Sequence, residues 1–193
     1  MPKFADIPTF TKSAPYSIDM PWYDIEHWIG QHSDNREDRF MVDLNPDFQR
    51  GHVWTTKQQI AYIEYALRGP TSGKDIYWNC STWGVSLRNA TGKIVRPMYS
   101  TPLQIVDGLQ RLTAVRRFLA DEIPAYESRF SQYTDRLRMT QVGFKFHIND
   151  LPTRAEVLTW YLEINHTGTP HSTDELRRVR ALLRRAKAEG LHA

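Results

Sequence analysis

The sequence predicts an α+β domain, in which a small mixed sheet is flanked by helices and followed by further helices at the C-terminal end. Short segments that are apolar, or that alternate apolar and polar residues as strands do, are mixed with segments whose apolar residues recur at helical spacing. They do not form a regular strand–helix–strand repeat. The sequence contains no internal repeat and no low-complexity tract. Hydrophobic residues make up 40% of the 193 residues and charged residues 24%, which is typical of one globular domain with its own core.

The expected domain organisation is an extended arm followed by one domain. Residues 1–20 contain three prolines and no period, so they are expected to form the arm, and residues 21–193 the domain, with a C-terminal helical subregion from about residue 153. Strands are expected at 39–44, 75–80, 103–106 and 143–148, with a hairpin over 86–100. Helices are expected at 21–30, 55–69, 109–121, 154–168 and 172–190. The polar segment 124–142 has no clear assignment.

Two helices carry recognisable start and stop residues. The helix in TTKQQIAYIEYALRG is expected to be capped by Thr55 or Thr56 and closed by Gly69. The last helix is expected to be capped by Ser172 or Thr173, and acids follow in its first turn, with Glu175 three positions after Ser172.

Composition limits the class of protein. The net charge of +3 permits a polyanionic partner without requiring one. The single cysteine, Cys80, excludes an internal disulfide and a cysteine-based zinc site, and its aromatic neighbours indicate a buried thiol. No apolar run approaches the ~20 residues that span a bilayer, and the first ten residues do not resemble a signal peptide. We therefore expect a cytoplasmic protein, in a bacterial or phage-infected cell, with no membrane partner.

Two motif-like features do not support a site. The segment GPTSGKD (69–75) has three residues between its glycines where a phosphate-binding P-loop needs four, and it follows a helix, so it is interpreted as a connector. Five polar residues between positions 147 and 166 hint at a metal-dependent nuclease centre, but they lie on separate expected helices and strands. They are His147, Asn149, Asp150, Asn165 and His166. Surface and capping roles are favoured for them.

The turn in VDGLQR (106–111) carries residues suited to binding an anion. Free backbone N–H groups at a helix N-terminus attract anions, and Gly108 lets a phosphate approach the main chain. Arg111, one turn into the helix, is placed to reach a phosphate oxygen. Asp107 suits a magnesium ligand or a proton acceptor. Taken alone, the turn is explained equally well by Asp107 capping the helix and Arg111 forming a surface ion pair.

A second turn favours the anion site. The stretch NPDFQRGHVW (45–54) places an acid, an amide, an arginine and a histidine before another helix. Two such junctions are hard to explain as independent caps. If the two helix N-termini converge, Arg50 and Arg111 would clamp one polyphosphate from two sides, with Gln49, His52 and Gln110 orienting the groups.

Basic residues crowd the last helix. Leucines and Val179 mark its buried stripe, and the remaining positions hold Arg177, Arg178, Arg180, Arg184, Arg185 and Lys187. This pattern is either a solvated basic face or a contact for nucleic-acid phosphates, for which Arg177, Arg178, Arg184 and Arg185 are the candidates.

Three blocks give the sequence a family resemblance: NPDFQRGHVWTTKQQ, VDGLQRLTAVRRF and YLEINHTGTPHSTDELR. In this order they resemble the N-terminal domain of GmrSD-type restriction proteins, formerly a domain of unknown function, over roughly residues 18–185. The resemblance implies a fold similar to the ParB/sulfiredoxin fold, whose members bind ATP or CTP at a Gly–x–x–Arg turn. The family's DGQQR is DGLQR here, so Leu109 removes one polar contact and leaves the choice of nucleotide and the hydrolytic rate open.

The resemblance also implies a chemistry. It implies binding of ATP or another NTP, Mg²⁺, and phosphoryl transfer connected to DNA, often modified DNA. The restriction proteins carry a separate nuclease domain after this one, whereas this sequence ends at Ala193. The output is therefore expected through a separate nuclease or modification enzyme, or through transfer of the phosphate to an acceptor, as in the related sulfiredoxin and free-serine kinase.

The leading hypothesis is an ATP/Mg-dependent phosphotransferase or NTPase acting on or with DNA. Its most specific form is a kinase for a hydroxyl on a modified base of the hydroxymethyl-pyrimidine type. Asp107 would be the general base or magnesium ligand, and Arg111 and Arg50 would neutralise charge. The remaining candidates are the nucleotide-binding residues Gly108, Leu109, Gln110, Gln49, His52 and Thr113, and the residues Asn165 and His166, which would close the site.

Two alternatives remain. The chain would be a nucleotide-gated sensor of modified DNA that recruits a separate nuclease, or a non-catalytic DNA-binding module. A direct nuclease role is least favoured, because the sequence shows no convincing set of metal ligands for phosphodiester cleavage.

Overall fold

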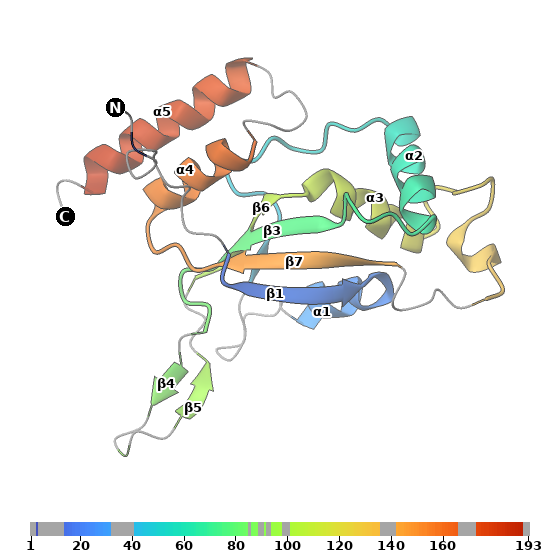
Figure 1. The fold of residues 1–193 in the computed structure, drawn as a ribbon, viewed down its shortest axis with the longest axis horizontal. Coiled ribbons are helices and arrows are strands. Elements are labelled where there is room, and N and C mark those ends of the chain that lie inside the picture. Colours follow the sequence, from blue (N-terminus) through green and yellow to red (C-terminus); the bar gives the residue numbers. More distant parts are fainter. Residues whose placement is uncertain are drawn as a thin grey trace.

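A five-stranded mixed sheet organises the computed structural model, which describes residues 3, 14–31, 41–84, 86–88, 91, 94–97, 101–135, 142–165 and 173–190. Across the sheet the strands follow the order β1 (Tyr16–Pro21), β7 (Gly143–Asn149), β3 (Asp75–Asn79), β6 (Leu103–Asp107) and β2 (Val42–Asp43). A separate pair, β4 (Ser86–Arg88) and β5 (Ile94–Pro97), extends away from this sheet (Figure 1). The predicted α+β class is confirmed.

The register of the central strands places three polar residues side by side. β3 runs parallel to β7 and antiparallel to β6, and β1 is antiparallel to β7. Tyr77 on β3 is paired with His147 on one side and with Asp107 on the other. Because residues opposite each other in a sheet share a face, these three side chains form one row.

The helices are distributed along both faces of the sheet. They are η2 (Trp22–Asp24), α1 (Ile25–Gln31), α2 (Thr56–Leu67), α3 (Leu109–Leu119), η3 (Phe130–Gln132), α4 (Arg154–Ile164) and α5 (Thr173–Gly190). α4 and α5 lie together on one side of the sheet, whereas α2 and α3 lie toward its other end (Figure 1). In the described residues, no helix has the length and apolar character that crossing a membrane requires.

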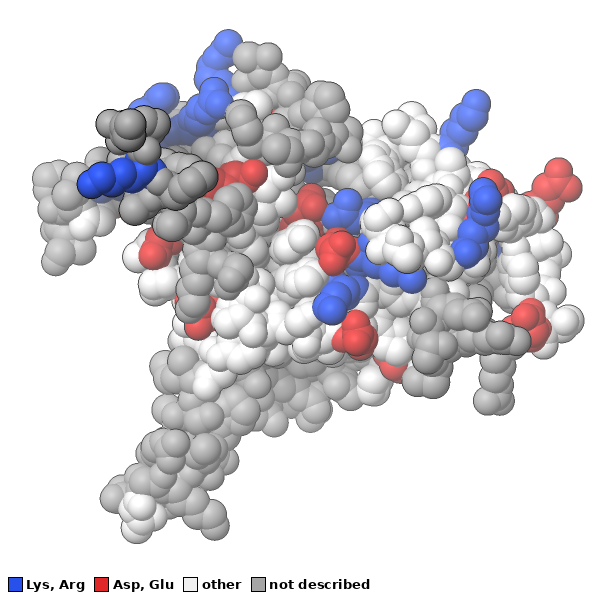
Figure 2. All heavy atoms as spheres, in the orientation of Figure 1, with Lys and Arg blue, Asp and Glu red and all other residues white. Residues whose placement is uncertain are grey.

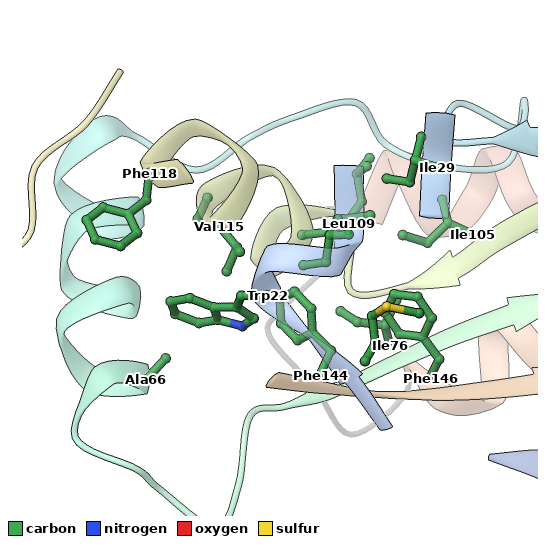
Figure 3. Packing of buried hydrophobic residues seen from close by; sticks show 14 of the residues in the cluster. Trp22, Ile29, Ala66, Ile76, Ile105, Leu109, Val115, Phe118, Phe144 and Phe146 are labelled. Atoms are coloured by element: carbon green, nitrogen blue, oxygen red, sulfur yellow. The ribbon is translucent and has the colours of Figure 1, made fainter. Parts of the chain in front are cut away.

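The main core fills one face of the sheet. Ile76, Phe144 and Phe146 point from the strands into a cluster with Trp22 and with Val115 of α3 (Figure 3). Side chains of α1 and α2 belong to the same cluster, so three helices are held to this face by apolar burial. Cys80 is buried there, as its aromatic neighbours predicted.

The opposite face of the sheet is covered only in part. A second core joins Val106 to Leu158, Trp160 and Tyr161 of α4 and to Val179 of α5. Along β3 and β7, the residues that alternate with the main core are Asp75, Tyr77, Lys145, His147 and the two asparagines that end the strands. The end of this face that carries Asp75 is partly open to solvent, since the Asp75 side chain is 45% exposed.

Several predicted boundaries shift. Residues 16–20, placed in the N-terminal arm by the sequence, belong to β1, because Ile18 and Met20 pack against the main core. The other arm residues except Lys3 and Ala14–Pro15 lie outside the described residues. Thr55, one of the two proposed caps, is the N-cap of α2 with a complete capping box. The helix predicted to reach residue 168 ends at Ile164, with Asn165 as its C-cap.

Candidate functional site

The turn between β6 and α3 is built around Gly108. This residue is the N-cap of α3 with φ +100°, and no side chain caps the helix. A Cβ atom here would lie 2.5 Å from Cδ1 and 3.2 Å from Cα of Ile76, so both the backbone angle and the space require glycine. The first N–H groups of α3 therefore lie at a helix N-terminus without a side-chain cap, an arrangement that suits an anion.

Arg111 and Asp107 form an ion pair across this turn. Nη2 of Arg111 lies 2.7 Å from Oδ2 of Asp107 and donates to the carbonyl oxygen of Asp75 at 2.9 Å. Their side chains are 24% and 30% exposed, so the pair is accessible from solvent. Nε of Arg111 is buried and has no hydrogen-bond partner among the described residues. The alternative explanation of this turn was an ion pair of Arg111 together with capping of the helix by Asp107. The ion pair is present, but the prediction of capping is wrong, because Gly108 is the N-cap and no side chain caps the helix.

The segment 45–54 is docked on the same turn by two amide side chains. Gln110 accepts from the backbone N–H groups of Val53 (2.9 Å) and Trp54 (3.1 Å), and its Nε2 donates to the carbonyl of Gly51 at 3.0 Å. Gln49 donates to the carbonyls of Ile105 (3.1 Å) and Val106 (2.7 Å). The predicted convergence of the two turns is therefore present, and both amides bind backbone groups.

A bulge in β6 provides the acceptors for Gln49. Tyr77 pairs with Asp107 and Trp78 with Ile105, so Val106 is an extra residue in the strand. Its carbonyl and that of Ile105 are both within reach of one Gln49 amide.

Arg50 lies beside α5. Its Nη1 is 3.8 Å from Oε2 of Glu175, and its side chain is 16% exposed. Charges from both regions act on the hydroxyl of Tyr161. Burial raises its pKa to about 12, the positive charge of Arg50 opposes this shift, and the negative charges of Glu175 and Asp107 add to it. Arg50 and Asp107 therefore both act on one tyrosine hydroxyl.

His52 and Thr113 lie apart from the ion pair. Nε2 of His52 is 2.8 Å from Nε2 of Gln59, whose Oε1 accepts from Arg117 at 2.9 Å. Because the Gln59 oxygen is occupied, its amide nitrogen donates and His52 accepts. Thr113 lines a separate hollow of about 430 Å³ with Glu26, Arg116 and Arg117. Leu109 packs into the main core, so the residue that departs from DGQQR contributes its side chain to packing.

The C-terminal candidates have mixed surroundings. Arg178 donates to the carbonyl of Gln49 at 2.9 Å and so joins α5 to the segment 45–54. Arg177 and Arg185 are exposed and pair with Asp174 and Glu189 on their own helix, and Arg184 is exposed. Asn165 binds the carbonyl of Tyr161 at 2.8 Å, whereas His166 lies outside the described residues.

A second polar pair lies beside the first and was missed from the sequence. Nε2 of His147 is 2.7 Å from Oδ1 of Asp75, and the His147 ring stacks on Tyr77 with centroids 4.8 Å apart. Burial, together with the charges of Asp75 and Asp107, raises the pKa of the Tyr77 hydroxyl, and Arg111 opposes the shift. The signal for this pair in the sequence was the alternation of polar residues with Ile76 and Phe146 along the two strands. The pairing itself depends on β3 and β7 being neighbours.

Charged side chains gather on the face of the molecule that Figure 2 draws. Figure 2 shows acidic and basic side chains gathered near the centre of this face, between α4 and α5 on one side and α2 on the other. Among the described residues, no three His, Cys, Asp or Glu side chains are grouped so that they could hold a metal ion.

Comparison with known proteins identifies a family for most of this region. Residues 25–154 match the family described as GmrSD restriction endonuclease, N-terminal domain. The match includes both the segment 45–54 and the turn of residues 107–111. No curated protein and no solved structure matches the chain significantly, so the ParB/sulfiredoxin likeness stays a prediction.

Proposed function

Because the chain belongs to the family of GmrSD restriction endonuclease N-terminal domains, we propose that it is an NTP-binding module of a restriction-type system that acts with DNA. Phosphoryl chemistry would take place at the turn of residues 107–111. The observation that carries this proposal is the docking of segment 45–54, which bears Arg50, on that turn through the amide of Gln110.

The turn suits a triphosphate for three reasons. The helix N-terminus offers backbone N–H groups that no side chain caps, and Gly108 supplies the left-handed backbone angle on which this turn depends. Arg111 is paired with Asp107, and a phosphate oxygen would compete for the guanidinium. Arg50, on the docked segment, adds a second positive charge.

Magnesium would be held by Asp107 together with phosphate oxygens and water. Mg²⁺ at nucleotide sites commonly takes only one or two protein carboxylates, so a single partly exposed carboxylate fits this role. The ion would supply neutralisation of the phosphate charge.

The proposal is tested with Arg111→Ala. Charge-assisted hydrogen bonds contribute about 1.5–3 kcal/mol, so ATP affinity measured by calorimetry in the presence of Mg²⁺ should fall by roughly 10- to 100-fold. Arg116→Ala is the matched control, because Arg116 lies on the same helix but pairs with Glu26. Equal ATP affinity of the wild type and Arg111→Ala would contradict the assignment, and absence of NTP binding by the wild type would contradict the function.

The fate of the phosphate separates the versions of this function. In the kinase version, label from γ-labelled ATP enters duplex DNA that carries hydroxymethyl-pyrimidine. In the sensor version, modified DNA stimulates the release of inorganic phosphate, the DNA stays unlabelled, and a separate nuclease acts as partner. A DNA-binding module would bind DNA and no nucleotide.

Contact with DNA is proposed for the exposed arginines of α5. Arg177 and Arg185 are held by solvent-exposed ion pairs, which contribute little and can be exchanged for phosphates. Arg178 is assigned mainly to positioning, because it binds the carbonyl of Gln49.

A further inference from the structure

The His147 ring is held in one orientation by two contacts. Nε2 lies 2.7 Å from the Asp75 carboxylate, and one ring face stacks on Tyr77 with an angle of 18° between the planes. The side chain of His147 is 22% exposed. In the part of the chain that the structure describes, Nδ1 has no hydrogen-bond partner. With the proton on Nε2 and directed to Asp75, the lone pair of Nδ1 is available to accept a proton.

Asp75 connects this histidine to the arginine of the proposed nucleotide site. Its carboxylate binds His147, while its backbone carbonyl accepts from Nη2 of Arg111 at 2.9 Å. Tyr77 is the residue between His147 and Asp107 in the sheet. Adjacent strands are about 4.8 Å apart, so the backbones of His147 and Asp107 are separated by roughly 10 Å. The Tyr77 ring stacks on His147 within this row, so a phosphoryl group and its acceptor oxygen would approach the two side chains from the solvent side of the row.

We propose that His147, oriented by Asp75, is the general base that activates the acceptor in the phosphoryl transfer. This inference rests on the function proposed above. The hydroxyl of water or of an alcohol gives its proton to Nδ1 of His147 as its oxygen attacks the γ-phosphorus. The bond from the γ-phosphorus to the bridging oxygen breaks, and its electron pair stays on the nucleoside diphosphate. The imidazolium then returns its proton to solvent.

The assignment divides two roles between two pairs. In the first pair, the carboxylate of Asp107 suits the cation and the guanidinium of Arg111 suits the phosphates, whereas in the second pair the Asp75 carboxylate orients the ring of His147. Besides Asp75, the groups that share this face with His147 include Ser17 and Asp19 on β1, Lys145 on β7 and Tyr77 on β3. Asp75 is therefore the positioning residue, and His147 the catalytic one.

The test compares the turnover and the binding of His147→Gln. Removing a general base costs about 10²- to 10⁴-fold, so the single-turnover rate of phosphate release from labelled ATP, with and without hydroxymethylated duplex DNA, should fall by at least 100-fold. The Kd for ATP should stay within about twofold, because Arg111 and Gly108 are unchanged. His27→Gln is the matched control, since His27 is an exposed residue of α1. Asp75→Asn should slow turnover by about 10-fold or more with ATP binding retained.

Chemical rescue separates a base from a structural role. In His147→Ala, added imidazole should restore a measurable part of the rate in a concentration-dependent manner, and thermal melting should verify that the variant is folded. A His147→Gln variant that turns over at the wild-type rate would overturn the inference alone. A folded His147→Ala variant that is slow and not restored by imidazole would also overturn it. A wild type that binds no NTP would overturn both this inference and the proposed function.

Discussion

At the scale of single residues, the site depends on Gly108 and on residues that each bind two partners. Gly108 allows β3 to approach the start of α3, and Arg111 then reaches both Asp107 and the carbonyl of Asp75. Asp75 in turn binds His147. A change in one of these side chains is therefore expected to disturb its neighbours.

Gly108→Ala should destabilise the protein by about 1–3 kcal/mol, because it combines a left-handed backbone angle with a clash against Ile76. The free energy of unfolding is measured by urea titration followed by tryptophan fluorescence. Gly51→Ala is the control, since no heavy atom lies within 4 Å of the Cβ it would add. Similar stabilities of the two variants would mean that the turn relaxes without cost.

The sequence was sufficient to single out the two residues of the first pair, whereas it gave His147 a surface or capping role and did not pair it with Asp75. Asp107, Gly108 and Arg111 lie within the short segment 107–111, and their turn has a recognisable composition. Asp75 and His147 are 72 residues apart, and they meet only because β3 and β7 are parallel neighbours. Gln110 was predicted to orient a nucleotide, which stays a prediction, and the three backbone groups that its amide binds were not predicted.

At the scale of elements, local signals predicted the helices well. Most helices begin within a few residues of the predicted start, because capping residues and apolar periods are local properties of the chain. The order of the strands in the sheet, and the packing of α4 and α5 on only part of one face, were not predicted. Those features depend on contacts between distant segments.

The α2 capping box gives a prediction at this scale. Thr55→Ala should lower the free energy of unfolding by about 1 kcal/mol, because the Thr55 side chain accepts from the N–H of Gln58 at the start of the helix. Thr56→Ala is the control, as Thr56 lies one residue later and is exposed. Both are measured by chemical denaturation. A larger loss of unfolding free energy in Thr56→Ala than in Thr55→Ala would show that Thr55 is not the residue that caps the helix.

At the scale of the whole molecule, buried tyrosines link stability to alkaline pH. Burial raises the pKa of Tyr161 from 10.0 to about 12, and it also raises the pKa values of Tyr62 and Tyr77. A raised pKa in the folded state means that the folded protein keeps its proton while the unfolded chain loses it. The resulting stabilisation is complete below pH 10 and is lost as the pH rises to about 12.

Tyr161→Phe should make the free energy of unfolding less dependent on pH between 10 and 12. The shift of Tyr161 corresponds to about 2–3 kcal/mol, and the other two tyrosines should leave a residual slope. Denaturation at pH 8, 10 and 11.5 measures the difference between the variant and the wild type. An unchanged slope in the variant would show that Tyr161 does not contribute.

The hydrogen bonds of Gln110 join the segment 45–54 and the turn of residues 107–111, so these two parts of the sequence are expected to evolve together. One amide holds three backbone groups of a segment that lies up to 59 residues earlier in the chain. Replacing either segment alone, by recombination with a relative, would leave those groups without their shared partner unless the glutamine and the loop shape arrive together. Natural exchange or engineered grafting of this site is therefore constrained to move both segments at once.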